Sequence, residues 1–454
     1  MRQTDYCEPV LRKARSLHVD ECEVVHTKRH IITVRITDSE IAELKQNVES
    51  VTGVRLIHEK KILAALSTKP DDTSIIERAM LARQNIKPKN FWRSLPHESK
   101  FGRVEKTYDK RLELLSGKEA VTLAEQMVDS STHQNVSRIS GSLNVVSEEF
   151  EIGNTRGLYC SDKGTYISGT INADSDAGSM PVSGVGAVSC RTLDSFSPTR
   201  IGTKAREMCL GSINPARCET DKYSVIFEPY AMGEMLAFVF SSNFNLKTYS
   251  EKRSCFSGKQ GSRIASEIFS LIDDPHFPDG IGSKPFDDEG TPTKTRYLVD
   301  SGVFSGTYSD LFQAFKEGTE STGNASRLGS PMGRAATPVP SPSPHNLVIK
   351  EGNIGMEEMI RETKKGLLVG RLWYTYSVNP ERGDFSCTAR SGVRIIENGK
   401  IVRPGRPVRI VHNLPILLEN VESIGNNPER ILQWSALPCV TPAVKVSGIV
   451  ASPL

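Results

Sequence analysis

Three adjacent carboxylates are the first residues in this sequence whose types could do chemistry. Asp287, Asp288 and Glu289 stand together in "FDDEGTPTKTRYLVDSGVFSG" (286–306), within a chain whose formal net charge is +3. Hard oxygen ligands in a loop could bind Ca²⁺ or Mg²⁺, but the regular alternation of an EF-hand loop is absent and no further acidic ligands lie close in sequence. The alternative is a surface turn, because Gly290 and the proline that follows it are typical turn residues. The residues alone favour the turn.

The histidines do not complete a zinc motif. A catalytic zinc site commonly needs His and carboxylate ligands gathered on one helix face. His58 and His97 are each followed by glutamate, but neither has a second histidine four or five positions later. His26 and His30 stand four apart, but their flanks are strand-like, and an extended strand separates them by roughly 13 Å. We expect these to be surface histidines. The others have no ligand spacing: His18, His133, His276, His345 and His412.

Other classes of site are also missing from the sequence. There is no G-x-S-x-G nucleophile motif and no phosphate-binding Gly-rich loop. The nine cysteines contain no C-x-x-C pair, which excludes a zinc ribbon and a disulfide framework. No run of five Lys or Arg is present, so a strong phosphate-tracking patch for nucleic acid is not expected. The longest apolar run, 235–240, is too short to span a membrane, and the start lacks a secretory signal. We expect a cytoplasmic protein.

The first half of the chain predicts mixed α and β structure. β-branched residues predict a strand at 23–36 and a hairpin at 53–66. Ser74 with Glu77, and Ser116 with Glu119, resemble capping boxes that open helices at about 75–85 and 117–130. Alternating apolar residues and turn signals predict a strand meander from 135 to about 175.

The second half is richer in predicted strands. A buried strand at 224–229 is followed by helical patterns at 230–243 and 261–272. "KTRYLV" is expected to pair with "VFSGTY" across Asp300-Ser301-Gly302, and Asn398-Gly399 is a strong hairpin signal. The stretch 329–346 is rich in Pro and Ser and predicts a flexible loop. The expected fold is α+β: an N-terminal mixed α/β domain (1–200), then a β-rich C-terminal domain with helices (201–454).

Several segments together resemble the TldD/PmbA family of peptidase subunits. The opening stretch, in the longer form "GIGSKPFDDEGTPTKTRYLVDSGVFSGTYSDL", is followed by "STGNASR" (321–327), "VIKEGN" and "GDFSCTARSGVRIIENGKIVRPGRPVRI". The match is collinear from about residue 23 to the C-terminus. By this resemblance the turn is a shared family signature, and its residues are expected near a subunit contact or the peptide channel: Asp287, Asp288, Glu289, Gly290, Ser321, Thr322, Gly323 and Asn324.

The family pairs a catalytic TldD-type subunit with a TldE-type (PmbA) subunit. The catalytic subunit is known for H-E-x-x-x-H on a helix and a C-terminal cysteine that holds the metal. The matching helix here, 233–244, contains no histidine, although Glu228 and Glu234 remain nearby. Cys439 sits too near the C-terminus, among apolar residues, to be carried over as a ligand. These departures place the chain on the TldE side.

The resemblance implies a division of labour between two chains. This chain is expected to hold no cofactor, and a zinc-type divalent metal is expected in a TldD-type partner. The assembly would cleave unfolded or extended peptides, which could be held by hydrogen bonds to a strand edge. A homodimer could form when the partner is absent.

Two other functions stay open from the sequence. One is a self-sufficient metallopeptidase with a displaced site, built from the acidic turn and a distant histidine such as His276. The other is a regulatory binding protein, since PmbA-type proteins have been linked to control of DNA gyrase. The balanced charge argues against direct contact with DNA.

Overall fold

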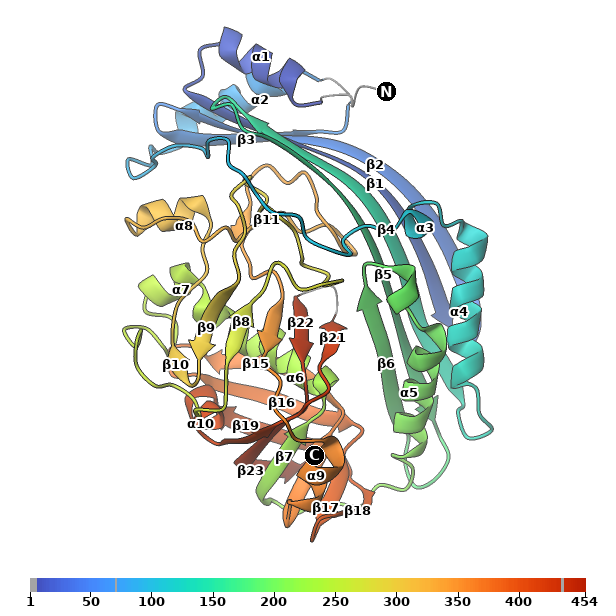
Figure 1. Ribbon diagram of the computed structural model, residues 1–454. Coiled ribbons are helices and arrows are strands. Elements are labelled where there is room, and N and C mark those ends of the chain that lie inside the picture. The colour runs from blue at the N-terminus through green and yellow to red at the C-terminus, as the bar shows by residue number, and fades with distance from the viewer. Residues whose placement is uncertain (1–5, 70–71, 434–436) are drawn as a thin grey trace.

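The structure is a computed structural model that describes residues 6–69, 72–433 and 437–454. Its first part is a six-stranded antiparallel sheet with strand order β3-β2-β1-β4-β5-β6. Figure 1 shows a long curved sheet with the C-terminal half of the chain lying inside the curve. The strands are β1 (Glu21–Thr37), β2 (Glu40–His58), β3 (Lys61–Ser67), β4 (Arg138–Asn154), β5 (Tyr159–Ser175) and β6 (Val182–Cys190).

Strand alternation divides this sheet into an outer and an inner face, because successive side chains point to opposite sides. Leu143 and Val145 of β4 pack on the outer side in one apolar cluster with α4 (Gly117–Ser131) and α5 (Pro198–Leu210). The intervening positions, such as Glu148 and Phe150, face the C-terminal half. At the other end of the sheet, the outer face is covered by helices α1 (Glu8–Ser16) and α2 (Ile75–Leu81). Short turns of helix complete this half: η1 (Ala82–Asn85), α3 (Lys110–Glu113) and η2 (Leu193–Ser195).

The two predicted capping boxes had different outcomes. At α4 the Ser116 side chain accepts from the Glu119 N–H, and the Glu119 carboxylate accepts from the Ser116 N–H, as predicted. At α2 the prediction of a capping box was wrong, because Ser74 makes no capping hydrogen bond. The Ser74 hydroxyl donates instead to the Asp72 carboxylate, at 2.6 Å. A nearby carboxylate is a stronger acceptor than a backbone group, and it takes the hydroxyl away from the helix end.

The second part contains three further sheets. The six-stranded one has the order β10-β9-β8-β13-β22-β21, and its strands are β8 (Leu271–Asp273), β9 (Arg296–Asp300), β10 (Val303–Phe304), β13 (Leu347–Ile349), β21 (Glu429–Leu432) and β22 (Pro438–Thr441). A two-stranded sheet pairs β11 (Ala325–Ser326) with β12 (Ser341–Pro342). The strands of the nine-stranded sheet are β7 (Asp221–Phe227), β14 (Lys365–Val369), β15 (Arg371–Asn379), β16 (Asp384–Ser391), β17 (Arg394–Glu397), β18 (Lys400–Pro404), β19 (Val408–Asn413), β20 (Val421–Ile424) and β23 (Val444–Pro453).

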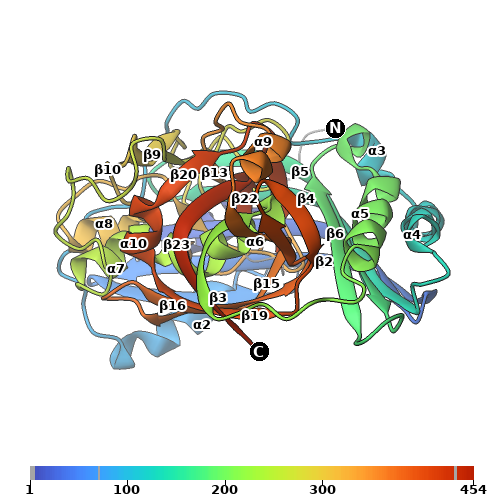
Figure 2. The same cartoon turned by 90° about the horizontal axis from the view of Figure 1, so that it is seen from below.

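A helical segment forms the centre of the second part. It consists of α6 (Pro229–Met235), a π turn η3 (Leu236–Phe240) and a 3₁₀ turn η4 (Ser241–Phe244). Figure 2 shows α6 with strands of the nine-stranded sheet around it. Its side chains belong to the large apolar cluster that also contains residues of both larger sheets. The remaining helices are α7 (Leu246–Ser250), α8 (Leu311–Lys316), α9 (Met356–Arg361) and α10 (Leu414–Glu419).

The hairpins predicted across Asp300-Ser301-Gly302 and at Asn398-Gly399 are confirmed, but the helix predicted at 261–272 was wrong. Asn398-Gly399 joins β17 to β18, and Ser301-Gly302 joins β9 to β10, each with positive φ at both central residues. Residues 261–272 run irregularly into β8 instead. Their N–H groups pair with the β9–β10 hairpin, for example from Ile264 to the Gly302 carbonyl, so the tertiary contact replaces helical bonds.

The Pro- and Ser-rich stretch 329–346 contains residues that pack inside the molecule. Met332, Arg334 and His345 are all buried. Polar groups of the first sheet hold it, since the Arg29 guanidinium donates to the Ser330 carbonyl at 3.1 Å. Its flexibility stays a prediction, as does the domain boundary at residue 200.

The predicted α+β class is confirmed. Among the described residues no helix has the length and apolar character needed to cross a bilayer.

Candidate functional site

The helical segment 229–244 changes from an α-helix to a π turn at the place where a metal motif would lie. A π turn closes hydrogen bonds between residues five apart and is often found at functional sites. In H-E-x-x-x-H the two histidines are themselves five apart, so a π turn suits that motif. Around Glu234 those two positions hold Gly233 and Phe238. The helix geometry for such ligands is present here without the ligands.

Glu234 itself is a buried carboxyl group with one strong contact. Its Oε2 accepts a hydrogen bond from the Leu372 N–H at 2.5 Å. Burial raises the pKa of Glu234 to about 8, although this N–H and the nearby Arg371 guanidinium act in the opposite direction. The group is therefore mostly protonated at neutral pH, and a protonated carboxyl is a poor ligand for a cation.

Cys439 lies against the same helix. This contact could not be seen in the sequence, because the two segments are far apart in the chain. Its thiol points to the Gly233 carbonyl at 3.9 Å and to the Leu437 carbonyl at 3.5 Å. Burial raises the pKa of the thiol far above its usual value. The strand β22 thus brings a cysteine beside the Gly233 carbonyl, but as a protonated and buried group.

These residues do not fit a zinc ion. A zinc site needs three or four nitrogen, sulfur or oxygen ligands around one point. A Cβ atom on Gly233 would lie 2.7 Å from the Ile431 side chain, so the space beside the helix is already filled. Nowhere in the described ranges are three His, Cys, Asp or Glu side chains grouped to hold a metal ion.

The acidic turn is buried, so its interpretation as a surface turn was wrong. Asp287, Asp288 and Glu289 each have 0% of their surface exposed. Asp287 organises the turn itself: its carboxylate accepts from the N–H groups of Glu289 and Thr291, and across the loop from Ala325 at 3.0 Å. Burial raises the pKa of Asp287. The turn is a packed internal corner, because the second part of the molecule brings donors to every carboxylate.

Gly290 is required by the backbone of this corner. Its φ is +81°, a conformation that L side chains rarely adopt. A Cβ atom there would also lie 2.3 Å from the Leu158 side chain of the first half. The glycine therefore permits both the turn and its close approach to the large sheet.

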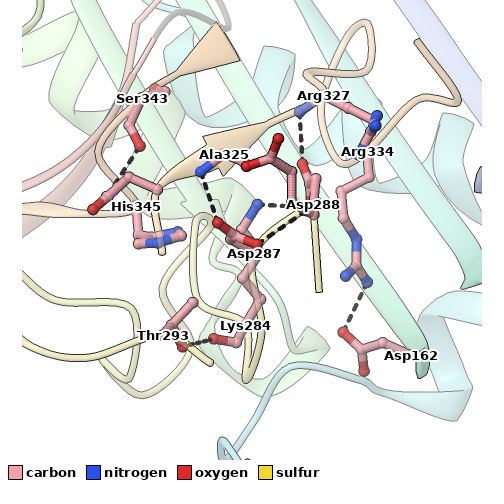
Figure 3. A network of polar contacts seen from close by, with 12 residues as sticks. Asp162, Lys284, Asp287, Asp288, Thr293, Ala325, Arg327, Arg334, Ser343 and His345 are labelled. Carbon is pink, nitrogen blue, oxygen red and sulfur yellow. Dashed lines mark hydrogen bonds and ion pairs between the residues drawn. The ribbon is translucent and has the colours of Figure 1, made fainter. Parts of the chain in front are cut away.

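Asp288 forms an ion pair with Lys284. The Lys284 ammonium donates to one carboxylate oxygen at 2.9 Å, and the Arg327 N–H donates to the other at 2.6 Å. Figure 3 shows Asp287 and Asp288 beside the backbone of Ala325 and Arg327, with Lys284 next to them. Burial acts to raise the pKa of Asp288, but Lys284 and Arg334 outweigh it and hold the pKa below its usual value. Asp288 is charged and neutralised within the molecule.

Glu289 joins the two halves of the chain. It pairs with the Arg55 guanidinium of β2 at 2.6 Å and accepts from the Leu311 N–H at the start of α8. Arg55 also pairs with Glu23 of β1, at 2.8 Å, and Glu23 pairs with Arg327. Burial raises the pKa of Glu289, while Arg55 lowers it. Each side chain of this alternating row of charges is at most 1% exposed.

The second family motif, residues 321–324, lies next to the acidic turn. Asn324 donates to the Asp273 carboxylate, and the next residue, Ala325, is a donor to Asp287. Burial raises the pKa of Asp273 to about 7. Gly323 accepts a hydrogen bond at 2.8 Å from buried His345, whose pKa is lowered by burial to about 3.

The first two residues of this motif contact the loop before α8. The Ser321 and Thr322 hydroxyls both donate to the Ser309 carbonyl, at 3.4 and 2.9 Å. The structure therefore brings the two motifs together as one network, in which Ser321 and Thr322 are half-buried and the other motif residues are buried. Their place near a subunit contact or the peptide channel stays a prediction.

His276 does not form a catalytic group with the acidic turn. The ring Nε2 of His276 lies 3.1 Å from the Thr293 hydroxyl, and the backbone N–H of His276 donates to the Asp274 carboxylate. Thr293 in turn donates to the Lys284 carbonyl, at 2.7 Å. The histidine stabilises the loop that carries Lys284, which is a structural role.

A cavity opens beside the helical segment. It measures about 480 Å³, within the range of ligand-binding cavities. One wall is the inner face of β4 and β5, and the opposite wall includes Tyr230 of α6 and Arg371 and Trp373 of β15. Arg371 is held by the Asn172 side chain at 2.6 Å, and its guanidinium lies 4.9 Å from the centre of the Trp373 ring. No sequence motif marks this site, since its walls come from both halves of the chain.

Comparison with known proteins agrees with the fold and the motifs. A family model described as the PmbA/TldA metallopeptidase C-terminal domain matches residues 220–452, more than half of the chain. The model of the central domain of the same family matches residues 106–212. The chain belongs to the PmbA/TldD family. It is a metallopeptidase-like protein whose matched segments contain both buried motifs and the helical segment.

Individual relatives cover almost the whole chain. The metalloprotease PmbA of Escherichia coli O157:H7 is 23% identical over 444 residues, which is 94% of this chain and 92% of that protein. An uncharacterised protein of Methanocaldococcus jannaschii is 25% identical over 383 residues, 84% of this chain and 86% of the relative. The crystal structure of TldE from Thermococcus kodakarensis superposes with a TM-score of 0.88 at 24% identity, over 98% of this chain and 100% of TldE. These similarities confirm the TldE (PmbA)-type resemblance of this family member.

Proposed function

We propose that this chain is the non-catalytic, TldE-type subunit of a cytoplasmic metallopeptidase. A TldD-type partner would hold a zinc-type metal, and the assembly would cleave unfolded or extended peptides. The observation that carries the proposal is the helical segment at Glu234. It has a π turn suited to ligands five apart, but the flanking positions are Gly233 and Phe238, and Ile431 fills the adjacent space.

Two further features support the proposal. Cysteines of the described residues, such as Cys160, Cys209 and Cys387, are buried free thiols, as is usual in a reducing compartment. The strand β15 ends the order of the nine-stranded sheet, and its first residues line the cavity beside the helix. An edge strand can add an extended peptide through main-chain hydrogen bonds. A homodimer in the absence of the partner is part of the same proposal.

The proposal is tested with the purified chain, alone and with a TldD-type partner. We expect no stoichiometric zinc in the chain alone and no cleavage of an unfolded peptide. With the partner, cleavage should appear and should be abolished by a chelator. Stoichiometric metal together with chelator-sensitive cleavage by the chain alone would contradict the proposal.

A variant of this chain separates a catalytic from a non-catalytic role. Loss of a general acid or base typically costs about 10²–10⁴ in rate. We expect Glu234→Gln in this chain to leave kcat/KM of the complex within about twofold of wild type, because Glu234 does no chemistry. A hundredfold loss with unchanged assembly would identify Glu234 as a catalytic group.

A further inference from the structure

A ladder of small polar side chains lines one wall of the cavity. The paired residues all lie on the inner face of β4 and β5, because the residues between them, such as Leu143 and Ile171, pack against the outer helices. The three cross-strand pairs are Ser140 with Asn172, Ser142 with Thr170, and Asn144 with Ser168. This wall is a band of hydroxyl and amide groups.

Several hydrogen-bond donors and acceptors of the ladder face the cavity. Asn144 uses its oxygen to accept from Thr33, and Asn172 uses its oxygen to accept from Arg371. Within the described part of the chain, the amide NH₂ groups of both asparagines have no hydrogen-bond partner. The same holds for three hydroxyls of the ladder, those of Ser140, Ser142 and Thr170. All of these side chains are half-buried. A half-buried array of unused donors and acceptors is suited to an uncharged polar ligand.

The opposite wall adds positive charge and one aromatic ring. Among the described residues that line the cavity, Arg371 carries the charge, and none of the lining side chains is a carboxylate. Two guanidinium groups lie over the Trp373 ring, with Arg371 at 4.9 Å and Arg390 at 4.8 Å from its centre. The electrostatic field of this wall favours an acidic ligand over a basic one.

We propose that this cavity is a peptide-binding site of the chain itself, for a short extended segment of small polar residues that carries a carboxylate beside Arg371. The inference rests on the proposed function for its ligand class, peptide. The ladder matches the amides and hydroxyls of such a segment, and Arg371 matches its carboxylate. The site would hold part of a substrate while chemistry occurs in the partner subunit.

The binding test uses the full chain without a partner and a fluorescein-labelled octapeptide of Ser, Asn and Gly ending in Asp. Fluorescence anisotropy should show saturable binding. A peptide with Lys in place of Asp, or one with Leu in place of Ser and Asn, should bind at least about fivefold more weakly. Amidating the C-terminus, with Asp retained, identifies whether the side chain or the terminal carboxylate contacts Arg371. Equal binding of the acidic, basic and apolar peptides would overturn the proposal.

Variants locate the bound peptide. Ser142→Ala with Thr170→Val removes two cavity hydroxyls without changing strand-forming character, and should weaken binding about fivefold or more, since each hydrogen bond contributes about 0.5–1.5 kcal/mol. The matched control is Ser161→Ala, on the opposite face of β5, which should leave the affinity unchanged. Unfolding midpoints of all variants verify the fold.

The outcomes separate this inference from the proposed function. Absence of saturable binding to the chain alone, or unchanged affinity of the double variant, overturns the inference even if the complex cleaves peptides. Saturable binding that the double variant weakens supports the site even if no complex with peptidase activity is found.

Discussion

Glu234 is a buried carboxyl group whose protonation couples to folding. Its pKa is about 8 in the folded chain against an ordinary value of 4.5. Between these two pH values the native state holds a proton that the unfolded state has released. Stability from this group is therefore fully present below pH 4.5 and is lost as the pH rises through 8.

Glu234→Gln should remove this pH dependence. The amide oxygen can still accept from the Leu372 N–H, but the side chain cannot ionise. We expect the free energy of unfolding of wild type to fall relative to the variant from pH 5 to pH 8.5, by up to about 1.4 kcal/mol per pH unit. Urea unfolding of both proteins across this range measures the difference. A constant difference at every pH would mean that Glu234 is ionised throughout.

The residue scale also explains why the acidic turn was misread. Three adjacent carboxylates with glycine and proline are typical of an exposed turn. Here Arg55, Lys284 and the N–H groups of a distant loop neutralise them; Lys284 is four residues from Asp288, but Arg55 and the loop are far away in sequence. The same reason applies to Cys439, whose contact with Gly233 spans about half of the chain.

At the scale of elements, the helical segment 229–244 was predictable in length but not in winding. Its apolar spacing predicted a helix, and the missing histidines could be read directly. The π turn and the packing of Ile431 against Gly233 depend on how β21 lies beside α6. These two features decide whether the segment can hold a metal.

Gly233→Ala should test that packing. Alanine is intrinsically better than glycine in a helix by about 1 kcal/mol. The added Cβ would lie 2.7 Å from the Ile431 side chain, however, and overpacking costs about 1–3 kcal/mol. We expect a net loss of stability in urea unfolding.

The matched control for this prediction is the double variant Gly233→Ala with Ile431→Ala. The smaller side chain at 431 gives the new methyl group room, so adding Gly233→Ala to Ile431→Ala should be neutral or stabilising. If Gly233→Ala destabilises both backgrounds equally, the contact with Ile431 is not the cause.

At the scale of the whole molecule, buried ion pairs join the large sheet to the C-terminal half. Arg55 pairs with Glu289, Arg327 with Glu23, and Arg334 with Glu148. Removing one member of a buried pair leaves an uncompensated charge and costs about 3–5 kcal/mol. The two halves should therefore unfold as one cooperative unit.

Glu148→Ala should weaken this unit, whereas Glu149→Ala provides the control from the neighbouring position. Glu148 is buried and holds Arg334, while Glu149 is part of a half-exposed pair with Lys163. We expect a single calorimetric transition in wild type and Glu149→Ala. Glu148→Ala should lower its midpoint strongly or split it into two. Two transitions in wild type, or the same effect from both variants, would contradict this coupling.

Sequence by itself determined the local structure and the family. Strand alternation, the Ser116 capping box and the Asn398-Gly399 turn depend on neighbouring residues, so they can be read from the chain. The absence of histidine in 233–244 is likewise a fact of the sequence. Tertiary structure decided which charges are buried together, where Cys439 lies, and that residues of β4, β5 and β15 enclose a polar cavity. Those features arise from contacts between segments hundreds of residues apart, which no local pattern encodes.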